Sequence, residues 1–218
     1  MSNVFIVGGA GKVGKRLTAE LVKRNHQVKT LYRNPEQTQE LESLGAQPVF
    51  GNLTELEETE LAEKFAGIDA VVFSAGAGGK GGEEMTNAID GRGLELSVDA
   101  AMKAGVKRFM LVSAFPESGR GRQISETFEN YMKVKKAADV YLAHSSLDWI
   151  ILRPGTLSDD AGKGRVNLGL AIPYGVVSRD DVALCLAEII DKPSVHHLIL
   201  ELTSGDTPVS DAVSQFAH

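Results

Sequence analysis

The sequence predicts a single α/β domain of the doubly wound Rossmann type, with a mostly parallel sheet of about seven strands and helices on both faces. Short apolar runs alternate with longer segments whose apolar residues recur at helical spacing, so strands and helices alternate along the chain. The strands are apolar throughout, which is typical of parallel strands buried between two layers of helices. At 218 residues, the chain has room for one well-packed domain and not for a second of ordinary size.

The first half of the chain is predicted to consist of successive strand and helix pairs. Val4, Phe5, Ile6 and Val7 form the first strand, which ends at a glycine. Val13, Leu17 and Leu21 then recur at helical spacing. Further strands are expected near residues 28–32, 48–50 and 69–74, and helices after Pro35, over about 55–65 and from roughly 84 to 104.

The second half continues the same alternation, with strands at 108–113, 148–153 and 197–202 and helices at 125–144 and 179–191, followed by a short terminal helix. Two apolar stripes support the long helices: Leu94, Val98, Ala101 and Met102 on the first, and Val134, Ala138, Tyr141 and Leu142 on the second. Ser178 and Asp181 resemble a capping box at a helix start. The glycine-heavy stretch 76–82 is predicted to be a mobile loop.

Composition narrows the functional class. Hydrophobic residues make up 43% and charged residues 24% of the chain, as in a soluble globular protein. The net charge of −6 provides no broad positive field, so neither nucleic acid nor a membrane surface is an expected direct partner. Cys185 is the single cysteine, which excludes an intramolecular disulfide, and its apolar neighbours predict a buried structural thiol. Residues 1–8 lead straight into a strand without a secretory pattern, so we expect a cytoplasmic protein.

A glycine-rich turn after the first strand predicts a dinucleotide site. Gly8, Gly11 and Gly14 fit G-x-x-G-x-x-G, and Gly9, Gly11 and Gly14 also fit G-x-G-x-x-G. A turn without side chains lets the backbone approach a pyrophosphate, and the helix start presents free N–H groups to it. The alternative is a tight structural turn without ligand.

The end of the second strand should set the choice of cofactor. NAD-specific sites usually place a carboxylate there, whereas this sequence has Tyr32, Arg33 and Asn34. Arg33 can form charge-assisted hydrogen bonds to a 2′-phosphate, with Lys12 as a second candidate cation. NADP(H) is therefore preferred and NAD(H) remains open; the alternative is that Arg33 is an ordinary surface arginine.

Tyr131 and Lys135 lie four residues apart on a predicted helix and should share a face. A lysine cation would lower the pKa of the tyrosine, so that Tyr131 could act as general acid or base in hydride transfer. Ser113, at the end of the fifth strand, could hydrogen-bond the substrate oxygen. The alternative is an ordinary solvated run, because Lys133 and Lys136 flank Lys135.

Other polar pairs were not predicted to form sites. His196 and His197 are adjacent in a predicted strand, so their side chains should point to opposite faces and a shared metal is not expected. Asp159-Asp160 falls in a predicted loop and Asp180-Asp181 at a helix start, and neither pair is assigned to catalysis.

Five segments in this order resemble the atypical, NmrA-like branch of the short-chain dehydrogenase/reductase superfamily, and the similarity runs over nearly the whole chain. The segments are Gly8-Gly9-Ala10-Gly11-Lys12-Val13-Gly14, Gly105-Val106-Lys107-Arg108-Phe109 leading to Val112-Ser113, Tyr131 with Lys135, Arg153-Pro154-Gly155, and Ser178-Arg179-Asp180-Asp181-Val182-Ala183. The resemblance implies a sheet of order 3-2-1-4-5-6-7, with the cofactor lying across the carboxyl ends of the strands.

The same resemblance implies positions for individual residues around the cofactor. Asn52 and Leu53 would lie near the adenine, and Lys135 would hold the nicotinamide ribose. Ser74, Ala75 and Gly76 would line the ribose and pyrophosphate, and Pro154 and Gly155 would pass beside the nicotinamide. Asp90 stands where relatives often carry asparagine, which leaves its part in any proton relay open.

These observations favour an NADPH-dependent oxidoreductase acting on a small carbonyl or quinone-like substrate. One alternative is an NADP(H)-sensing regulatory protein without turnover, which would act on a protein partner. A nucleotide-sugar epimerase or dehydratase fits less well, because only 65 residues follow Arg153. Residues from about 154 to 178 and the C-terminal tail are expected to form a small substrate-side region, in a monomer or a homodimer.

Overall fold

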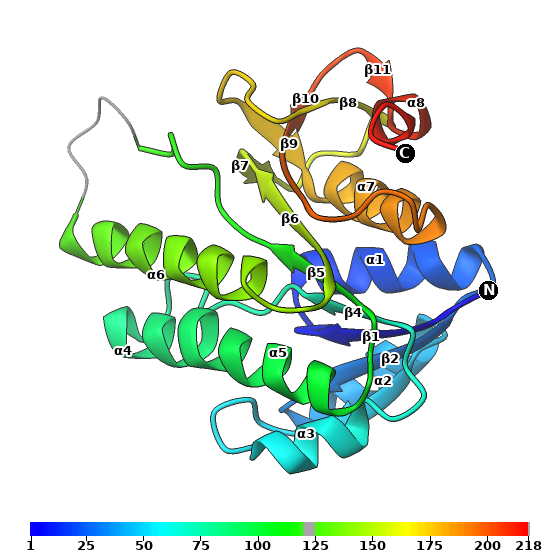
Figure 1. Cartoon of the computed structure of the whole chain (residues 1–218), viewed down its shortest axis with the longest axis vertical. Helices are drawn as coiled ribbons and strands as arrows, with labels where there is room; N and C mark the ends of the chain where they lie inside the picture. The colour runs from blue at the N-terminus through cyan, green and yellow to red at the C-terminus, as the bar shows by residue number, and fades with distance from the viewer. Residues whose placement is uncertain (120–124, 218) are drawn as a thin grey trace.

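The central sheet contains seven parallel strands in the spatial order β3-β2-β1-β4-β5-β6-β10 (Figure 1). The computed structural model describes residues 1–119 and 125–217. The strands are β1 Asn3–Val7, β2 Gln27–Tyr32, β3 Gln47–Phe50, β4 Ala70–Phe73, β5 Arg108–Val112, β6 Asp148–Pro154 and β10 Leu198–Ser204. Numbered along the chain, this order is 3-2-1-4-5-6-7, as the family resemblance implied.

The sheet is larger than the predicted seven strands. β8 (Arg165–Gly169) pairs antiparallel with β10, and β11 (Thr207–Pro208) pairs antiparallel with β8, which makes nine strands. β7 (Thr156–Ser158) and β9 (Val176–Ser178) form a separate two-stranded sheet. These additions were missed because they are short, and because only alternate residues of β8 are buried, so that no continuous apolar run marks it.

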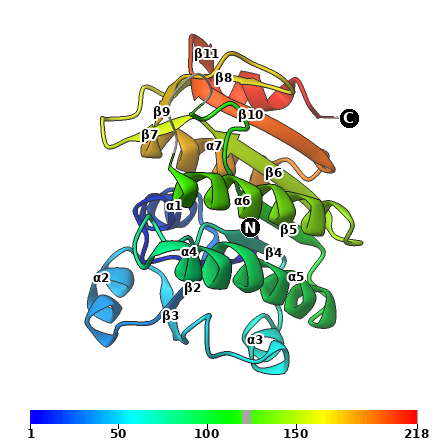
Figure 2. The same ribbon diagram turned by 90° about the vertical axis from the view of Figure 1, so that its left-hand side faces the viewer.

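Helices cover both faces of the sheet and create two cores. Val4 and Ile6 of β1 face the core under α1 (Lys12–Lys23) and α7 (Arg179–Asp191), with α8 (Val209–Ser214) beyond α7. Phe5 and Val7 face the other core, under α3 (Glu58–Lys64), α5 (Gly93–Lys103) and α6 (Glu126–Ala143). Figure 2 shows α5 and α6 side by side on that face. The turn η1 (Pro35–Gln37) and helix α2 (Thr38–Ser43) connect β2 to β3.

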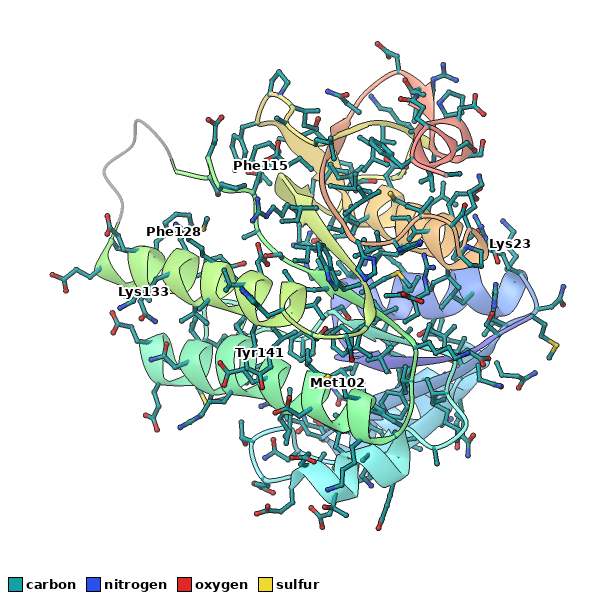
Figure 3. The ribbon with its side chains drawn as sticks, viewed as in Figure 1. Lys23, Met102, Phe115, Phe128, Lys133 and Tyr141 are labelled. Atoms are coloured by element: carbon teal, nitrogen blue, oxygen red, sulfur yellow. The ribbon has the colours of Figure 1, made fainter. Side chains whose placement is uncertain are left out.

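The segment predicted as one helix over 84–104 contains a π-helical turn. It begins with α4 (Gly82–Thr86), passes through η2 (Asn87–Arg92) and continues as α5. Gly82, expected to belong to a loop, is therefore the first residue of a helix. Met102 and Tyr141, predicted to lie on buried stripes, are 39% and 36% exposed. The hydroxyl of Tyr141 reaches Asp99 of α5, so a polar contact holds it at the surface (Figure 3).

The start of α7 only partly matches a capping box. Ser178 Oγ accepts a hydrogen bond from the Asp181 N–H at 3.0 Å, as the pattern predicted. The Asp181 carboxylate, however, accepts from the N–H groups of Lys163 and Gly164, and Asp180 accepts from that of Gly162. Asp180 and Asp181 therefore hold the loop at residues 162–164 against the start of α7, which is a structural role.

Cys185 is fully buried in α7, and burial raises the pKa of its thiol to about 12. Among the described helices, none combines the length and apolar character needed to cross a bilayer.

Candidate functional site

The turn between β1 and α1 has no room for side chains. Gly8 has a φ of +88°, and a Cβ there would lie 2.5 Å from the Ala75 nitrogen. A Cβ on Gly14 would lie 2.4 Å from the Gly8 oxygen. Gly11 caps α1 without a side-chain hydrogen bond, so the first amides of the helix face the turn. Such a backbone cradle, at the positive end of a helix dipole, fits a pyrophosphate.

A cavity of about 480 Å³ opens beside this turn, within the usual size range of ligand pockets. The sequence-predicted residues that line it are Gly8, Ala10, Gly11, Arg33, Asn52, Leu53, Ser74, Ala75 and Gly76. Gly9 lies behind the turn, where a Cβ would meet the side chain of Thr30, and Val13 is a buried residue of α1. Lys12, Gly14, Lys135, Pro154 and Gly155 do not line this cavity.

Two cations line the described wall of the cavity, Arg33 and Lys80. Both are exposed, and no ion pair joins either side chain to another described residue. Lys12, the predicted second cation, instead pairs with the Asp159 carboxylate and lowers the pKa of that group. Lys80 was missed because it lies in the glycine-heavy stretch. The available signal was its position four residues after Gly76, which the resemblance had placed at the ribose and pyrophosphate.

Lys135 is not part of a solvated run. It is 3% exposed, and its ammonium donates to the Val112 carbonyl at 2.9 Å, whereas Lys133 and Lys136 are exposed. Its Nζ also lies 3.7 Å from Oδ1 of Asp90, itself 3% exposed. Lys135 is therefore fixed at the carboxyl end of β5.

Asp90 connects the cavity to the helix that carries Tyr131. Its Oδ2 accepts the Ala77 N–H at 2.9 Å, and a Cβ on Gly76 would lie 3.0 Å from its Oδ1. The residue sits in the π-helical turn η2, and such turns occur often at functional sites. One carboxylate thus contacts both the loop that lines the cavity and the buried lysine.

The pKa of Tyr131 is raised, whereas a decrease was predicted. Burial, together with the smaller effects of the Asp90 and Asp139 charges, raises it to about 12. Burial lowers the pKa of Lys135, against the opposing effect of the same two carboxylates. The predicted decrease for Tyr131 was wrong because it considered the lysine without burial, which is the largest effect, and without the two acids nearby.

Asp139 and Arg153 complete this buried cluster. Arg153 donates through Nε and Nη2 to Oδ2 of Asp139, at 2.9 and 2.8 Å. The pKa of Asp139 is raised by burial, against the opposing effects of Ser113, Arg153 and Lys135. Asp139 follows Lys135 by four residues, as Lys135 follows Tyr131, so helical spacing was a signal that could have identified it.

Ser113 is buried directly after β5. Its Oγ makes no hydrogen bond of standard geometry to any residue in the described part of the chain, although it lies close enough to Asp139 to lower the pKa of that carboxyl. Ser113 therefore lies beside the Asp139 carboxyl group.

Gly155 permits close backbone packing in the predicted substrate-side region. A Cβ there would lie 2.1 Å from the Gly175 oxygen, which accepts the Thr156 N–H. The hydroxyl of Tyr174 meets that of Thr156, and its ring packs edge-on against Phe115, labelled in Figure 3. Thr156 of β7 thus contacts Tyr174, which precedes β9 and packs against Phe115.

The two adjacent histidines do not point to opposite faces. β10 begins only at Leu198, and His197 has a left-handed φ of +54°. This conformation brings the two Nδ1 atoms to 2.9 Å from each other. The prediction was wrong because it assumed an extended strand at this position.

Comparisons with known proteins agree with the geometry of the turn and cavity. A family model described as NAD(P)H-binding matches residues 8–193. The uncharacterized sugar epimerase YhfK of Bacillus subtilis is 36% identical over 214 residues, covering 97% of this chain and 99% of the relative. The putative NAD-dependent epimerase/dehydratase of Bacillus halodurans is 36% identical, with a TM-score of 0.90 and coverage of 99% and 100%. The anaerobillin reductase ChuY of Escherichia coli O157:H7 is 25% identical, with a TM-score of 0.78 and coverage of 94% and 98%.

Proposed function

Since the chain belongs to the NAD(P)H-binding, NmrA-like family of atypical short-chain dehydrogenases/reductases, we propose that it is an NADPH-dependent reductase of a small carbonyl or quinone-like substrate. The proposal depends on one observation: the half-buried Tyr131 lies near enough to Asp90 for that charge to raise its pKa, and Asp90 also contacts Lys135 and the loop lining the cofactor cavity. One solved relative, the anaerobillin reductase ChuY, supports this reaction class.

In the proposed reaction, Tyr131 is the general acid. Bound NADPH would supply the hydride to the substrate carbon. With a pKa of about 12, Tyr131 holds its phenolic proton at neutral pH, which is the form that can protonate the substrate oxygen. The resulting phenolate would form on the same helix face as the Lys135 ammonium, which favours the negative charge. Ser113 is proposed to donate a hydrogen bond to the same oxygen.

The substrate-side region favours an apolar or aromatic substrate. Leu170 and Val176 are 63% and 50% exposed in the segment between β6 and α7, and Tyr174 of the same segment packs against Phe115. A quinone or an aromatic ketone presents matching apolar surface. A cytoplasmic location and a monomeric or dimeric state complete the proposal.

Arg33 should determine the preference for NADP(H). Replacing it with aspartate removes a cation and adds a repulsive charge, so we expect NADP(H) affinity to fall roughly 10- to 100-fold while NAD(H) affinity changes little. Titration calorimetry with both cofactors measures this. Arg165→Asp, an exposed arginine on β8, is the matched control. Equal NADP(H) affinity in Arg33→Asp and wild type would contradict the preference.

Asp90 should set the alkaline limit of the reaction. Its charge raises the pKa of Tyr131, so Asp90→Asn should lower that pKa. Wild-type reduction is then expected to be nearly independent of pH between about 6 and 10. The variant should begin to lose activity within this range as pH rises, because its Tyr131 gives up its proton at a lower pH than in wild type. Stopped-flow rates at saturating NADPH test this. Superimposable profiles would remove Asp90 from the electrostatics of Tyr131.

Epimerisation of a nucleotide sugar is the second candidate, because two similar proteins carry epimerase in their names. Assays of NADPH oxidation with a carbonyl and quinone panel, beside assays of UDP-hexose interconversion, separate the two activities. Tight NADPH binding without turnover in either assay would favour a redox sensor.

A further inference from the structure

A cluster of two histidines and one aspartate lies at the edge of the sheet opposite the cofactor cavity. Asp148 begins β6, and His196 and His197 directly precede β10. The two strands are parallel, with Leu198 beside Ile150, so their amino ends bring these residues together. The cofactor turn lies at the carboxyl ends of the strands. The cluster is therefore separate from the proposed reductase site.

The side-chain spacing fits a bound transition-metal ion. One ligand atom from each of the three residues lies within 4.8 Å of the other two. The two histidine Nδ1 atoms are 2.9 Å apart. Two nitrogens bound about 2.0–2.1 Å from one ion, at angles of roughly 90–110°, would stand about 2.9–3.4 Å apart. The imidazoles already have the separation of neighbouring ligands.

The protonation of His197 also suits metal binding. Its Nε2 lies 3.1 Å from the Leu147 carbonyl, which can only accept, so the ring hydrogen is assigned to Nε2 and Nδ1 carries a lone pair. Metal-binding histidines characteristically donate their second ring N–H to a carbonyl or carboxylate. In the metal-free protein, His196 donates its Nδ1 hydrogen to His197, and an ion would replace that proton.

Neighbouring residues hold the cluster in place before an ion binds. The buried Arg108 guanidinium donates to the carbonyls of Ile189 and Val195, at 2.9 and 2.7 Å, which fixes the turn that leads into His196. The ring of His197 packs edge-on against Trp149, with centroids 5.5 Å apart. The left-handed φ of His197 is thus maintained by contacts on both sides.

We propose that Asp148, His196 and His197 bind one Zn²⁺ ion, with water completing the coordination. Two imidazole nitrogens and one carboxylate oxygen form a donor set that zinc commonly takes. The ion would join the start of β6 to the start of β10, and its role would be to stabilise this edge of the sheet.

Zinc titration of the metal-stripped, full-length protein by calorimetry tests the proposal. We expect one ion per chain, and at least a tenfold weaker affinity in His196→Gln, His197→Gln and Asp148→Asn. His144→Gln removes an exposed histidine at the end of α6 and should bind zinc like wild type. At about 100 times the dissociation constant, zinc should raise the Tm of wild type by roughly 5 °C or more, and of His196→Gln much less.

Absence of zinc uptake would overturn the proposal, as would equal affinity in wild type and both cluster-histidine variants. Several weak ions per chain, unaffected by the three substitutions, would mean adventitious surface binding only and would equally overturn it. All three positions are at the surface or beside it. If a histidine variant fails to fold, the zinc affinity of Asp148→Asn tests whether the cluster binds the ion. Because the readout is binding, the result does not depend on reductase activity.

Discussion

Tyr131→Phe should lower kcat for carbonyl reduction by about 100- to 10,000-fold, the usual contribution of a positioned general acid. Only the hydroxyl is lost, so the ring can keep its contact with Phe128, whose centroid lies 6.1 Å away. The cofactor cavity is lined by other residues, and the NADPH dissociation constant should change less than about threefold. Steady-state kinetics with the best substrate of the panel, together with NADPH titration, measure both quantities.

The matched control for this experiment is Tyr141→Phe. Tyr141 is on the same helix, but it lies at the surface and bonds Asp99, so its loss should leave kcat unchanged. Should Tyr131→Phe retain full activity, Tyr131 would have no part in proton transfer. A comparable loss in both variants would instead indicate a general effect on helix α6.

The glycine turn was predictable because its requirement is local. Gly8 has a left-handed φ of +88°, and a Cβ on Gly14 would meet the Gly8 oxygen, so both constraints arise within the strand-turn-helix unit and are recorded in the glycine spacing. The buried partners of Lys135 were not predictable in the same way, because Asp90 and the Val112 carbonyl come from elements distant in sequence. Asp139 could have been predicted from the sequence, since it continues the four-residue spacing of Tyr131 and Lys135.

Features that depend on backbone conformation were not predictable from residue patterns. The histidine pair depends on the left-handed φ of His197, a conformation that a non-glycine residue seldom adopts. Strand β8 depends on pairing with β10, and its own sequence alternates buried and exposed residues over only five positions. In both cases a tertiary contact selects the structure.

The buried charges around Tyr131 occur in opposite pairs. Lys135 faces Asp90, and Arg153 bonds Asp139, so two cations offset two carboxylates in a region shielded from water. Such pairs contribute little net stability, because desolvation offsets their attraction. In the proposed reaction, their position beside the half-buried Tyr131 would serve to control the charge at its hydroxyl.

Removing one member of either pair should therefore lower the free energy of unfolding, because the other member stays buried without a partner. Arg153→Met is expected to destabilise the protein by about 3–5 kcal/mol, because it leaves the Asp139 carboxylate buried without its partner. The pKa of Asp139 in the folded state is already raised above its ordinary value of 3.8, and loss of the arginine should raise it further. A carboxyl with a raised folded pKa favours folding below its ordinary pKa and disfavours it above the folded value.

The loss of unfolding free energy in Arg153→Met, relative to wild type, should consequently be largest at about pH 8. It should shrink as pH falls, since Asp139 then takes up a proton on folding. Urea unfolding of wild type and variant across this range measures the difference. Adding Asp139→Asn to Arg153→Met should recover part of the loss at about pH 8, because the amide carries no charge. Arg165→Met serves as the exposed control. A deficit that is independent of pH and unrelieved by Asp139→Asn would mean that Arg153 stabilises the fold through packing of its side chain and not through its charge.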